Sequence, residues 1–580
     1  MERLLLAVVA ILVGFQFVAA TILLGPSTLG PFGIAYYVAN GGSDSNNGLS
    51  PATAWQTIAH VNGQSLGPNA TVLFNGGQTF SGGVVITTSV SSSNITVGSY
   101  GAGQATISSG NSAACIVATN VPAVIVQNII CAGGGDTTNT TDGITVANSS
   151  ADTLTGPTIS NVTLSGYGAN GINISGTDTV GFTGVVITNN TIHDVTGNGG
   201  IHTSCIGINT PGHGTSPYSH FNITVTENTV YNCTGEASQS DWSGGGIGIY
   251  STDGGLVAHN VAHDFSANNT HCSGAGGFVA IASNAVTFQF NEAYNGKFAN
   301  GGCDGNGFDI DGGATNIVMQ YNWSHDNMGD GYLLDEYSGQ SAWNKNVLRF
   351  NIGQNDDSEI HVVSNPGTSM SACQVYNNTL YNSATAVIYQ QNSDTGAVDC
   401  NFSNNIFYTG SNASLLISMP NPSSMVFTGN DYFGGGTFSY NGRSYATFAL
   451  WQTASGQEKV KGVNVGRIKD PALYVPGGGL SNGGYVPANL IAYNLKPGSA
   501  MVGAGLNLST LYGINAGTQD YFGTPVSAAT LPVGAAAGHF AAFAASCSHS
   551  TTFAAPARRI IFPHTMRRTR HARRTRNVRC

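Results

Sequence analysis

Three short stretches with one shared pattern decide the fold of this chain: VAHNVAHDFSA (residues 257–267), FQFNEAYNG (288–296) and MQYNWSHDN (319–327). In each stretch a short run of alternating residues leads to an Asn, and a second short run follows it. Alternation with a period of two is typical of a β-strand. The stretches therefore predict pairs of short strands that meet at a repeated Asn.

The same Asn recurs along much of the chain at intervals of 27 to 38 residues. A unit of this length holds several short strands but cannot bury its own apolar face, so the units must stack. A third strand follows a Gly-rich loop, as in GGFVAIA, NGFDIDG and DGYLLDE. We therefore expect an all-β, single-stranded, right-handed parallel β-helix with three strands per coil and a hydrogen-bonded ladder of corner Asn side chains. The aligned positions are Asn161, Asn190, Asn228, Asn260, Asn291, Asn322, Asn351, Asn378 and Asn405.

The composition agrees with this fold class. Gly makes up 79 of the 580 residues and only 8% of the residues are charged, so the usual helix-forming residues are scarce. Nine of the 19 basic residues lie after residue 556, which leaves an acidic body of ten basic and 29 acidic residues. A body with this charge excludes nucleic acid as a partner, because phosphates require Lys and Arg.

The two ends of the chain are predicted to lie outside the β-helix. Residues 1–20, MERLLLAVVAILVGFQFVAA, have the basic start, apolar run and small residues of a signal peptide, so we expect a secreted protein that is not held in a membrane after cleavage. An uncleaved anchor is the alternative. The basic tail, residues 541–580, is expected to be disordered or to bind a polyanion. Between them we expect the β-helix at residues 36–430 and, at residues 431–540, an irregular segment that closes or flanks it.

Repeated pairs after each Asn look catalytic at first, since His193-Asp194, His263-Asp264 and His325-Asp326 recur at one offset. The same offset holds Tyr-Asn in other units, which favours a structural ladder.

The cysteines follow the same repeat. Cys272 and Cys303 occupy matching positions in neighbouring units, as do Cys373 and Cys400. In-register residues on adjacent coils are separated by about 4.8 Å, which suits a disulfide in an oxidising compartment. The registers of Cys205 with Cys233, and of Cys115 with Cys131, match less well.

The chain also resembles a known group, the exported right-handed parallel β-helix proteins of the pectate-lyase-like superfamily. The resemblance lies in YYVANGGSDSNNGLSPATAWQTIAHVN (36–62), TVLFNGGQTFSGGVVI (71–86) and ITVGSYGAGQATISSGN (95–111), which look like that group's N-terminal cap and first coils, and in GSAMVGAGLNLS (498–509) and QDYFGTPV (519–526) near the end. It implies the fold but not the reaction, because this scaffold carries lyases, hydrolases, epimerases and non-catalytic adhesins.

Three carboxylates form the predicted centre of a functional site. If Phe308 and Ile310 point inward, then Asp309 and Asp311 point outward, and the next coil places Asp335 beside Asp311. Like charges on neighbouring strands are unfavourable by up to roughly 1 kcal/mol a pair, so stability alone does not explain the cluster.

Paired carboxylates can hydrolyse a glycosidic bond, one as acid and the other as nucleophile or base. We therefore predict a monomeric, secreted hydrolase of extracellular polysaccharide that requires no cofactor. The predicted catalytic residues are Asp309, Asp311, Asp335, His361 and Glu359, and the predicted substrate-binding residues are Tyr250, Tyr337 and Asp330.

Two alternatives remain open. The resemblance implies that such a cluster could bind Ca²⁺, which in lyases of the superfamily bridges the enzyme to a polyuronate so that a Lys or Arg can abstract a ring proton. For this lyase or epimerase function the predicted metal ligands are Asp304, Asp330, Asp356 and Asp357. The other alternative is a non-catalytic extracellular protein that binds glycan in the same groove.

Overall fold

The computed structural model describes residues 33–86, 94–209, 218–410, 415–480 and 487–538. All of these residues belong to one compact unit. The predicted signal peptide, residues 1–20, and the basic tail, residues 541–580, both lie outside the described residues.

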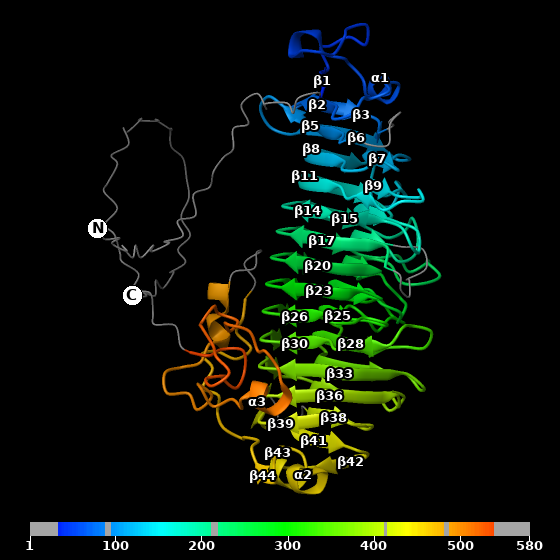
Figure 1. Cartoon of the computed structure of the whole chain (residues 1–580). Helices are drawn as coiled ribbons and strands as arrows, with labels where there is room; N and C mark the ends of the chain where they lie inside the picture. The colour runs from blue at the N-terminus through cyan, green and yellow to red at the C-terminus, as the bar shows by residue number, and fades with distance from the viewer. Residues whose placement is uncertain (1–32, 87–93, 210–217, 411–414, 481–486, 539–580) are drawn as a thin grey trace, which may run out of the picture. The chain divides into compact units, whose positions relative to one another are not determined.

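The described chain is an all-β parallel solenoid of about 12 turns, which confirms the predicted fold class (Figure 1). One turn consists of β23 (Asn284–Gln289), β24 (Glu292–Tyr294) and β25 (Phe308–Ile310). Each strand pairs in parallel with its counterpart in the next turn: β26 (Val318–Gln320), β27 (Trp323–His325) and β28 (Tyr332–Glu336). The three predicted strands per coil are therefore present.

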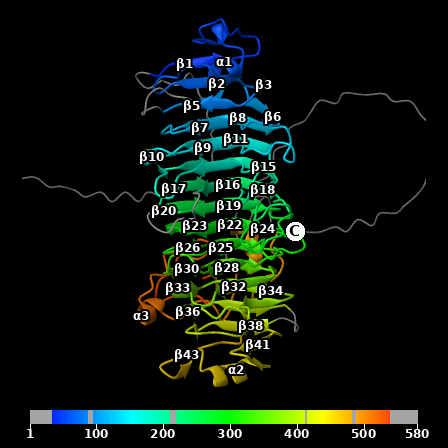
Figure 2. The same cartoon turned by 90° about the vertical axis from the view of Figure 1, so that its right-hand side faces the viewer.

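The third strands of the coils, with β42 added in antiparallel pairing at one end, form a sheet of fourteen strands within the described residues, referred to below as the 14-stranded sheet. Strands β16 to β32 of this sheet lie one above the other in Figure 2. In order, the sheet contains β4 (Val84–Ile86), β7 (Ile116–Thr119), β9 (Ile144–Ala147), β12 (Ile172–Ser175), β16 (Ser204–Asn209), β19 (Gly245–Tyr250), β22 (Phe278–Ile281), β25, β28, β32 (Ser358–Ser364), β35 (Ala386–Tyr389), β38 (Leu415–Met419), β41 (Thr437–Tyr440) and β42 (Arg443–Tyr445).

A continuous Asn ladder joins the coils at one corner. The side-chain amide of Asn291 donates to Val257 O at 2.9 Å and to Asn322 Oδ1 at 3.0 Å, while its own Oδ1 accepts from the amide nitrogens of Asn260. The pattern repeats from Asn190 to Asn430, where the carboxylate of Glu458 ends it by accepting from Asn430 Nδ2 at 2.7 Å. The ladder therefore satisfies the backbone groups that each bend leaves open.

Asn161 is not part of this ladder, so its alignment in the sequence was wrong by one residue. The backbone N–H of Val162 donates to Asn190 Oδ1 at 2.9 Å, which makes Val162 the equivalent corner position. Asn161 is exposed and has a φ of 52°, a left-handed conformation that Asn tolerates better than most residues.

The His-Asp and Tyr-Asn pairs form the predicted structural ladder. The rings of His193, Tyr231, His263, Tyr294 and His325 stack in sequence, with centroids 4.8 to 5.0 Å apart. The residue that follows each ring has a φ of 54° or 55°, so Asp and Asn are selected here for the bend.

The disulfides follow the coil register as expected. Cys272 pairs with Cys303 and Cys373 pairs with Cys400, with Cα atoms 4.9 and 4.3 Å apart. The weaker pairings are present as well, Cys115 with Cys131 and Cys205 with Cys233.

The solenoid continues beyond residue 430, the predicted end of its coils. β40 (Asp431–Gly434) and β41 extend the stack, and α2 (Phe448–Ser455) packs Trp451 against its last apolar layer. Residues 458–480 and 487–538, which include α3 (Leu508–Tyr512), then return along the side of the coils. There the Asn515 carbonyl accepts from Arg349, and Ala535 N donates to Thr379.

At the other end, α1 (Ile58–Asn62) packs Ile58 and Val61 into the first coils. Among the residues that the structure describes, no helix combines the length and apolar character that a bilayer span requires.

Candidate functional site

The outward stripe of the 14-stranded sheet has the register expected from the sequence. Asp309 lies between Val279 and Leu333 on the neighbouring strands, and Leu333 pairs with His361. Ile310 pairs with Leu334, so Asp311, the residue after the end of β25, is equivalent in sequence to Asp335 of β28.

Four carboxylates of this stripe and its preceding loop line one cavity of about 440 Å³: Asp304, Asp309, Asp311 and Asp335. We call this cavity the acidic pocket. The predicted substrate-binding residues Tyr250 and Tyr337 line it too. The remaining lining residues are His202, Asp241, Trp242, Cys272, Ser273, Gly274, Val279, Ile281, Leu333, Gln340, Val363 and Asn365.

The carboxylates of the pocket are much less exposed than an outward position suggests. Asp309 is 2% exposed and Asp311 is 7% exposed. Aromatic residues explain this burial, because Trp242, Tyr250 and Tyr337 belong to a small apolar cluster that borders the pocket. The sequence predicted solvent-facing carboxylates, whereas the structure encloses them outside the solenoid core.

This enclosure raises the pKa values of carboxyl groups in the pocket. Burial, with the carboxylates of Asp311 and Asp335, raises the pKa of Asp309 well above its usual range. Burial, with Asp311 and then Asp304, does the same to the pKa of Asp335. Burial raises the pKa of Asp304 to about 6. Such raised values are typical of carboxyl groups that hold a proton near neutral pH.

Asp311 differs from its neighbours in having a backbone donor. Burial raises its pKa to about 7, but the N–H of Gly312, 2.6 Å from Asp311 Oδ1, acts in the opposite direction. Asp309 Oδ1 and Asp335 Oδ1 are buried and find no hydrogen-bond donor among the described residues. The pocket therefore holds one carboxylate that is stabilised in its charged form and two whose buried oxygens remain unpaired.

His361 and Asp330 lie beside the pocket and form a close pair. His361 Nδ1 is 2.7 Å from Asp330 Oδ2, and Ser358 donates its hydroxyl to Asp330 Oδ1. Burial opposes a charge on His361, but the facing Asp330 raises the pKa of the imidazole above its ordinary value. Asp330 in turn raises the pKa of Asp304, which connects the pair electrostatically with the pocket.

Glu359 does not lie on this face, so its predicted position on the outward stripe was wrong. The alternation breaks at the start of β32, since Ser358 and His361, three residues apart, both contact Asp330. Glu359 is fully buried on the opposite side, where its Oε1 accepts from Asn382 Nδ2 at 3.2 Å and its Oε2 packs on Gly353.

The four predicted calcium ligands are not brought together. Asp304 lines the pocket, Asp330 pairs with His361, Asp357 is exposed, and Asp356 is buried, with its Oδ1 accepting from Asn327 Nδ2 at 2.8 Å. Within the described residues, no group of three or more His, Cys, Asp or Glu side chains is arranged to hold a metal ion.

Comparisons with known proteins give similarities of fold only. No protein-family model matches the chain, and no curated protein matches it. Among solved structures, the chain is similar to the GH136 lacto-N-biosidase from Eubacterium ramulus (16% identity, 63% of this chain and 66% of that chain, TM-score 0.45). It is also similar to the catalytic unit of a GH87 α-1,3-glucanase from Streptomyces thermodiastaticus (13%, 66% and 67%, TM-score 0.41) and to pectate lyase Pel9A (14%, 88% and 97%, TM-score 0.33).

The fold of this chain is established by its own stacked coils and Asn ladder rather than by these similarities. The described chain is an all-β parallel β-helix. Proteins of this fold carry different chemistries, so the function of this β-helix depends on its own pocket.

Sequence reasoning missed a second group of residues in the pocket of this β-helix. His202 Nε2 lies 3.0 Å from Asp241 Oδ2, and Ser273 donates its hydroxyl to Asp241 Oδ1. These residues come from the loops that precede β16, β19 and β22, where the repeat gives no register. The sequence offered one indication of these residues: Asp241 and Trp242 stand in a Gly- and Ser-rich loop just before a predicted strand.

Proposed function

We propose that this protein is an extracellular glycoside hydrolase whose acidic pocket cleaves a polysaccharide. The observation that supports this proposal is the enclosure of Asp309, Asp311 and Asp335 in one cavity, with raised pKa values and one backbone-stabilised carboxylate. Glycoside hydrolysis requires a protonated carboxyl group and an ionised one in the same site. The four disulfides support export, since such bonds persist in oxidising compartments.

We assign the roles from the differences between the three carboxyl groups. Asp335 is the proton donor to the leaving oxygen, because its pKa is raised well above the usual range and it is less buried than Asp309. Asp311 is the nucleophile or the base, because the Gly312 N–H stabilises its charge. Asp309 remains protonated, because burial and the neighbouring carboxylates raise its pKa well above the usual range. His361 positions Asp330 and adds positive charge beside the pocket.

The chemistry of the lining favours hydrolysis over elimination. The lyases of the superfamily are expected to use a Lys or Arg base, and none of the described residues that line the pocket is Lys or Arg. Arg349 lies on β30 (Val347–Arg349) of another sheet, where Gln320 Oε1 and the Asn515 carbonyl accept its hydrogen bonds. The separation of the four predicted calcium ligands also favours hydrolysis, because the lyase reaction would require them to bind one metal ion together.

The experiment is an activity assay of single variants against a panel of polysaccharides. We expect Asp311→Asn and Asp335→Asn each to lower kcat by roughly 10²- to 10⁴-fold, the usual contribution of a positioned acid or base. Asp178→Asn, which changes an exposed carboxylate on a turn, is the matched control and should leave kcat unchanged. Thermal unfolding of each variant checks that the fold is retained.

Three outcomes would contradict the proposal. Activity that survives the Asn replacement of Asp309, Asp311 and Asp335 would remove the assigned residues. An unsaturated, ultraviolet-absorbing product that disappears with chelator would indicate a calcium-dependent lyase. Glycan binding without turnover across the panel would indicate a non-catalytic binding protein.

A further inference from the structure

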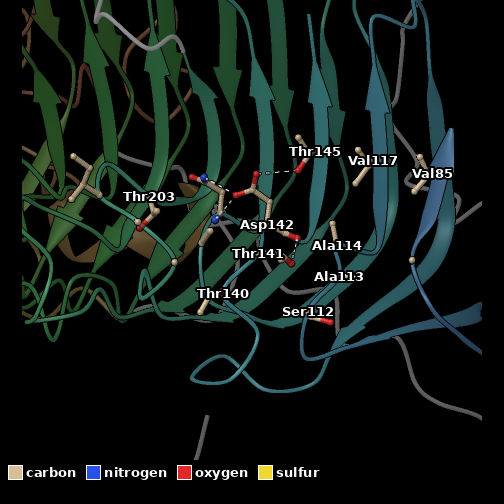
Figure 3. A pocket seen from close by; sticks show the side chains of 16 residues that line it. Val85, Ser112, Ala113, Ala114, Val117, Thr140, Thr141, Asp142, Thr145 and Thr203 are labelled. Carbon is tan, nitrogen blue, oxygen red and sulfur yellow. Dashed lines mark hydrogen bonds between the residues drawn. The ribbon is translucent and has the colours of Figure 1, made fainter. Parts of the chain in front are cut away.

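A second cavity, of about 640 Å³, lies on the 14-stranded sheet nearer the N-terminus; we call it the distal cavity. Figure 3 shows Val85, Val117 and Thr145 projecting side by side into it from three successive strands, β4, β7 and β9. Turn residues that precede these strands and the next ones complete its wall. Val85 is 44% exposed and Ile201 is 41% exposed, so the cavity presents apolar side chains to solvent.

The single carboxylate of the distal cavity, Asp142, is held by its neighbours (Figure 3). Its Oδ1 accepts from the backbone and side-chain nitrogens of Asn170 at 2.9 and 3.0 Å. Its Oδ2 accepts from Thr145 Oγ1 at 3.0 Å and from Asn173 Nδ2 at 2.8 Å. With both oxygens engaged, Asp142 joins neighbouring coils and fixes Thr145 and Asn170 in the cavity wall.

The distal cavity adjoins the acidic pocket. Ile201 and Thr203 line the distal cavity, and His202 between them lines the acidic pocket. Both cavities also lie on strands of the same sheet, from β4 to β9 in one and from β19 to β32 in the other. A chain molecule that runs along the stack can therefore contact both.

The charge of the two cavities selects among such molecules. Five carboxylates line the acidic pocket and one lines the distal cavity, and none of the described lining residues of either is Lys or Arg. A polyuronate or sulfated chain would bring anionic groups against the ionised Asp241 and Asp311 without a Lys or Arg among the described lining residues, which is unfavourable in an enclosed site. Sugar rings without charge can instead place their apolar faces on Val85, Val117 and Ile201 and their hydroxyls on the polar wall.

We infer that the two cavities form one groove for an uncharged polysaccharide, in which the distal cavity binds sugar residues several coils away from the cleavage point. The inference rests on the proposed function for the identity of the ligand as glycan. It adds the substrate class and a second binding region.

Gly200 offers a way to block the distal cavity alone. An ideal Cβ at Gly200 would meet no atom within 4 Å, and its φ is not in the left-handed region, so Gly200→Tyr should fold and fill the cavity. A second blocking variant, Val85→Arg, changes a side chain that is already 44% exposed. Gly41→Tyr is the matched control, since Gly41 has the same open surroundings and lines neither cavity.

The test measures binding by titration calorimetry in the Asp335→Asn background, with short and long oligosaccharides of neutral glucose, xylose, mannose and galactose, and with galacturonate oligosaccharides. We expect a neutral series to bind more tightly as it lengthens and galacturonates to bind weakly or not at all. Gly200→Tyr and Val85→Arg should each weaken binding of the long neutral chain roughly tenfold and remove the length dependence, while Gly41→Tyr should not.

The inference is overturned if both blocking variants bind long chains as the parent does, if galacturonates bind more tightly than every neutral series, or if no neutral series binds. These outcomes are separate from those of the proposed function. Length-dependent binding of a neutral chain that the wild-type protein never cleaves would support the groove and contradict the hydrolase. Cleavage without length dependence would support the hydrolase and contradict the groove.

Discussion

At the scale of single residues, the acidic pocket shows how one backbone contact can separate similar side chains. Asp309, Asp311 and Asp335 lie in one enclosed cavity, yet only Asp311 receives a close backbone N–H, from Gly312. A hydrogen bond to the charged form favours ionisation, whereas burial opposes it. The three carboxyl groups are therefore divided between charged and neutral states at the same pH.

This division predicts the pH dependence of kcat/KM. Asp311 must be ionised to act, so the rate should rise as the pH increases through its pKa of about 7 and fall again where Asp335 loses its proton. Asp304 raises the pKa of Asp311, so Asp304→Asn should lower that pKa and move the acidic limb of the profile to lower pH. Initial rates across the pH range measure both limbs.

Asp178→Asn is again the control, because its exposed side chain lines neither cavity. An acidic limb that stays in place in Asp304→Asn, or moves to higher pH, would contradict the proposed role of Asp311.

Strand alternation predicted some of these residues and failed for others. It correctly placed Asp309, Asp311 and Asp335 on one face because β25 and β28 are regular there. It failed for Glu359 because β32 breaks the alternation at its first residues, and a pattern of period two cannot show such a break.

At the scale of the elements, the corner Asn side chains hold strands that are otherwise very short. β24 and β27 contain three residues each, so each contributes few ladder hydrogen bonds of its own. The Asn between consecutive strands adds bonds to the coils on either side. The coil therefore depends on its corner as much as on its strands.

Replacing one corner residue should be costly. Asn291→Ala removes the partner of Val257 O and of the Asn260 nitrogens, all buried, and each unsatisfied buried group costs about 1 to 3 kcal/mol. We expect the free energy of unfolding to fall by roughly 2 to 5 kcal/mol, measured by chemical denaturation.

Asn401→Ala is the matched control, because this Asn lies in a strand, is half-buried and has no side-chain hydrogen bond to another described residue. Equal losses of stability in the two variants would show that the corner has no special role.

The sequence predicted the ladder because a spacing of about thirty residues is too regular for chance, and the rings and cysteines repeat with it. It misplaced the first rung because Asn is favoured at two adjacent positions, at the corner for its hydrogen bonds and just before it for its left-handed φ. Residues 161 and 162 can be distinguished only when the strand pairing is known.

At the scale of the whole molecule, buried carboxyl groups with raised pKa values extend beyond the pocket. Burial raises the pKa of Asp356 to about 8 and that of Glu458, at the end of the Asn ladder, to about 7. Asp304 and Asp311 have values of about 6 and about 7. The folded chain therefore binds more protons than the unfolded chain between the ordinary carboxyl pKa and about 8.

This excess of bound protons predicts that stability falls as the pH rises. The stabilising effect is complete below the unfolded pKa of about 4 and is lost as the pH rises through the folded pKa values. The free energy of unfolding should therefore be larger at pH 5 than at pH 8, by on the order of several kcal/mol. The melting temperature should be higher at pH 5 for the same reason. Asp356→Asn keeps an oxygen for Asn327 but cannot ionise, so its melting temperature should depend less on pH. A wild-type melting temperature that increases from pH 5 to pH 8 would contradict this account.

The long return of residues 458–480 and 487–538 was the least predictable part of the described fold. These residues carry no repeat, and their position depends on contacts with distant coils, such as Asn515 with Arg349 and Gly479 with Gln354. The sequence could indicate only that the segment closes or flanks the helix. The loops that complete the acidic pocket were unpredictable for the same reason.

The regular stacking of the coils also sets the distance between the two cavities. Each coil between the two cavities adds one strand to the 14-stranded sheet, so the distance from the distal cavity to the carboxylates is counted in whole coils of about 4.8 Å. A duplication or loss of one complete turn would keep every remaining rung bonded while moving the two cavities apart or together by a single increment. The spacing of the two cavities can thus change without any change to the residues that line either one.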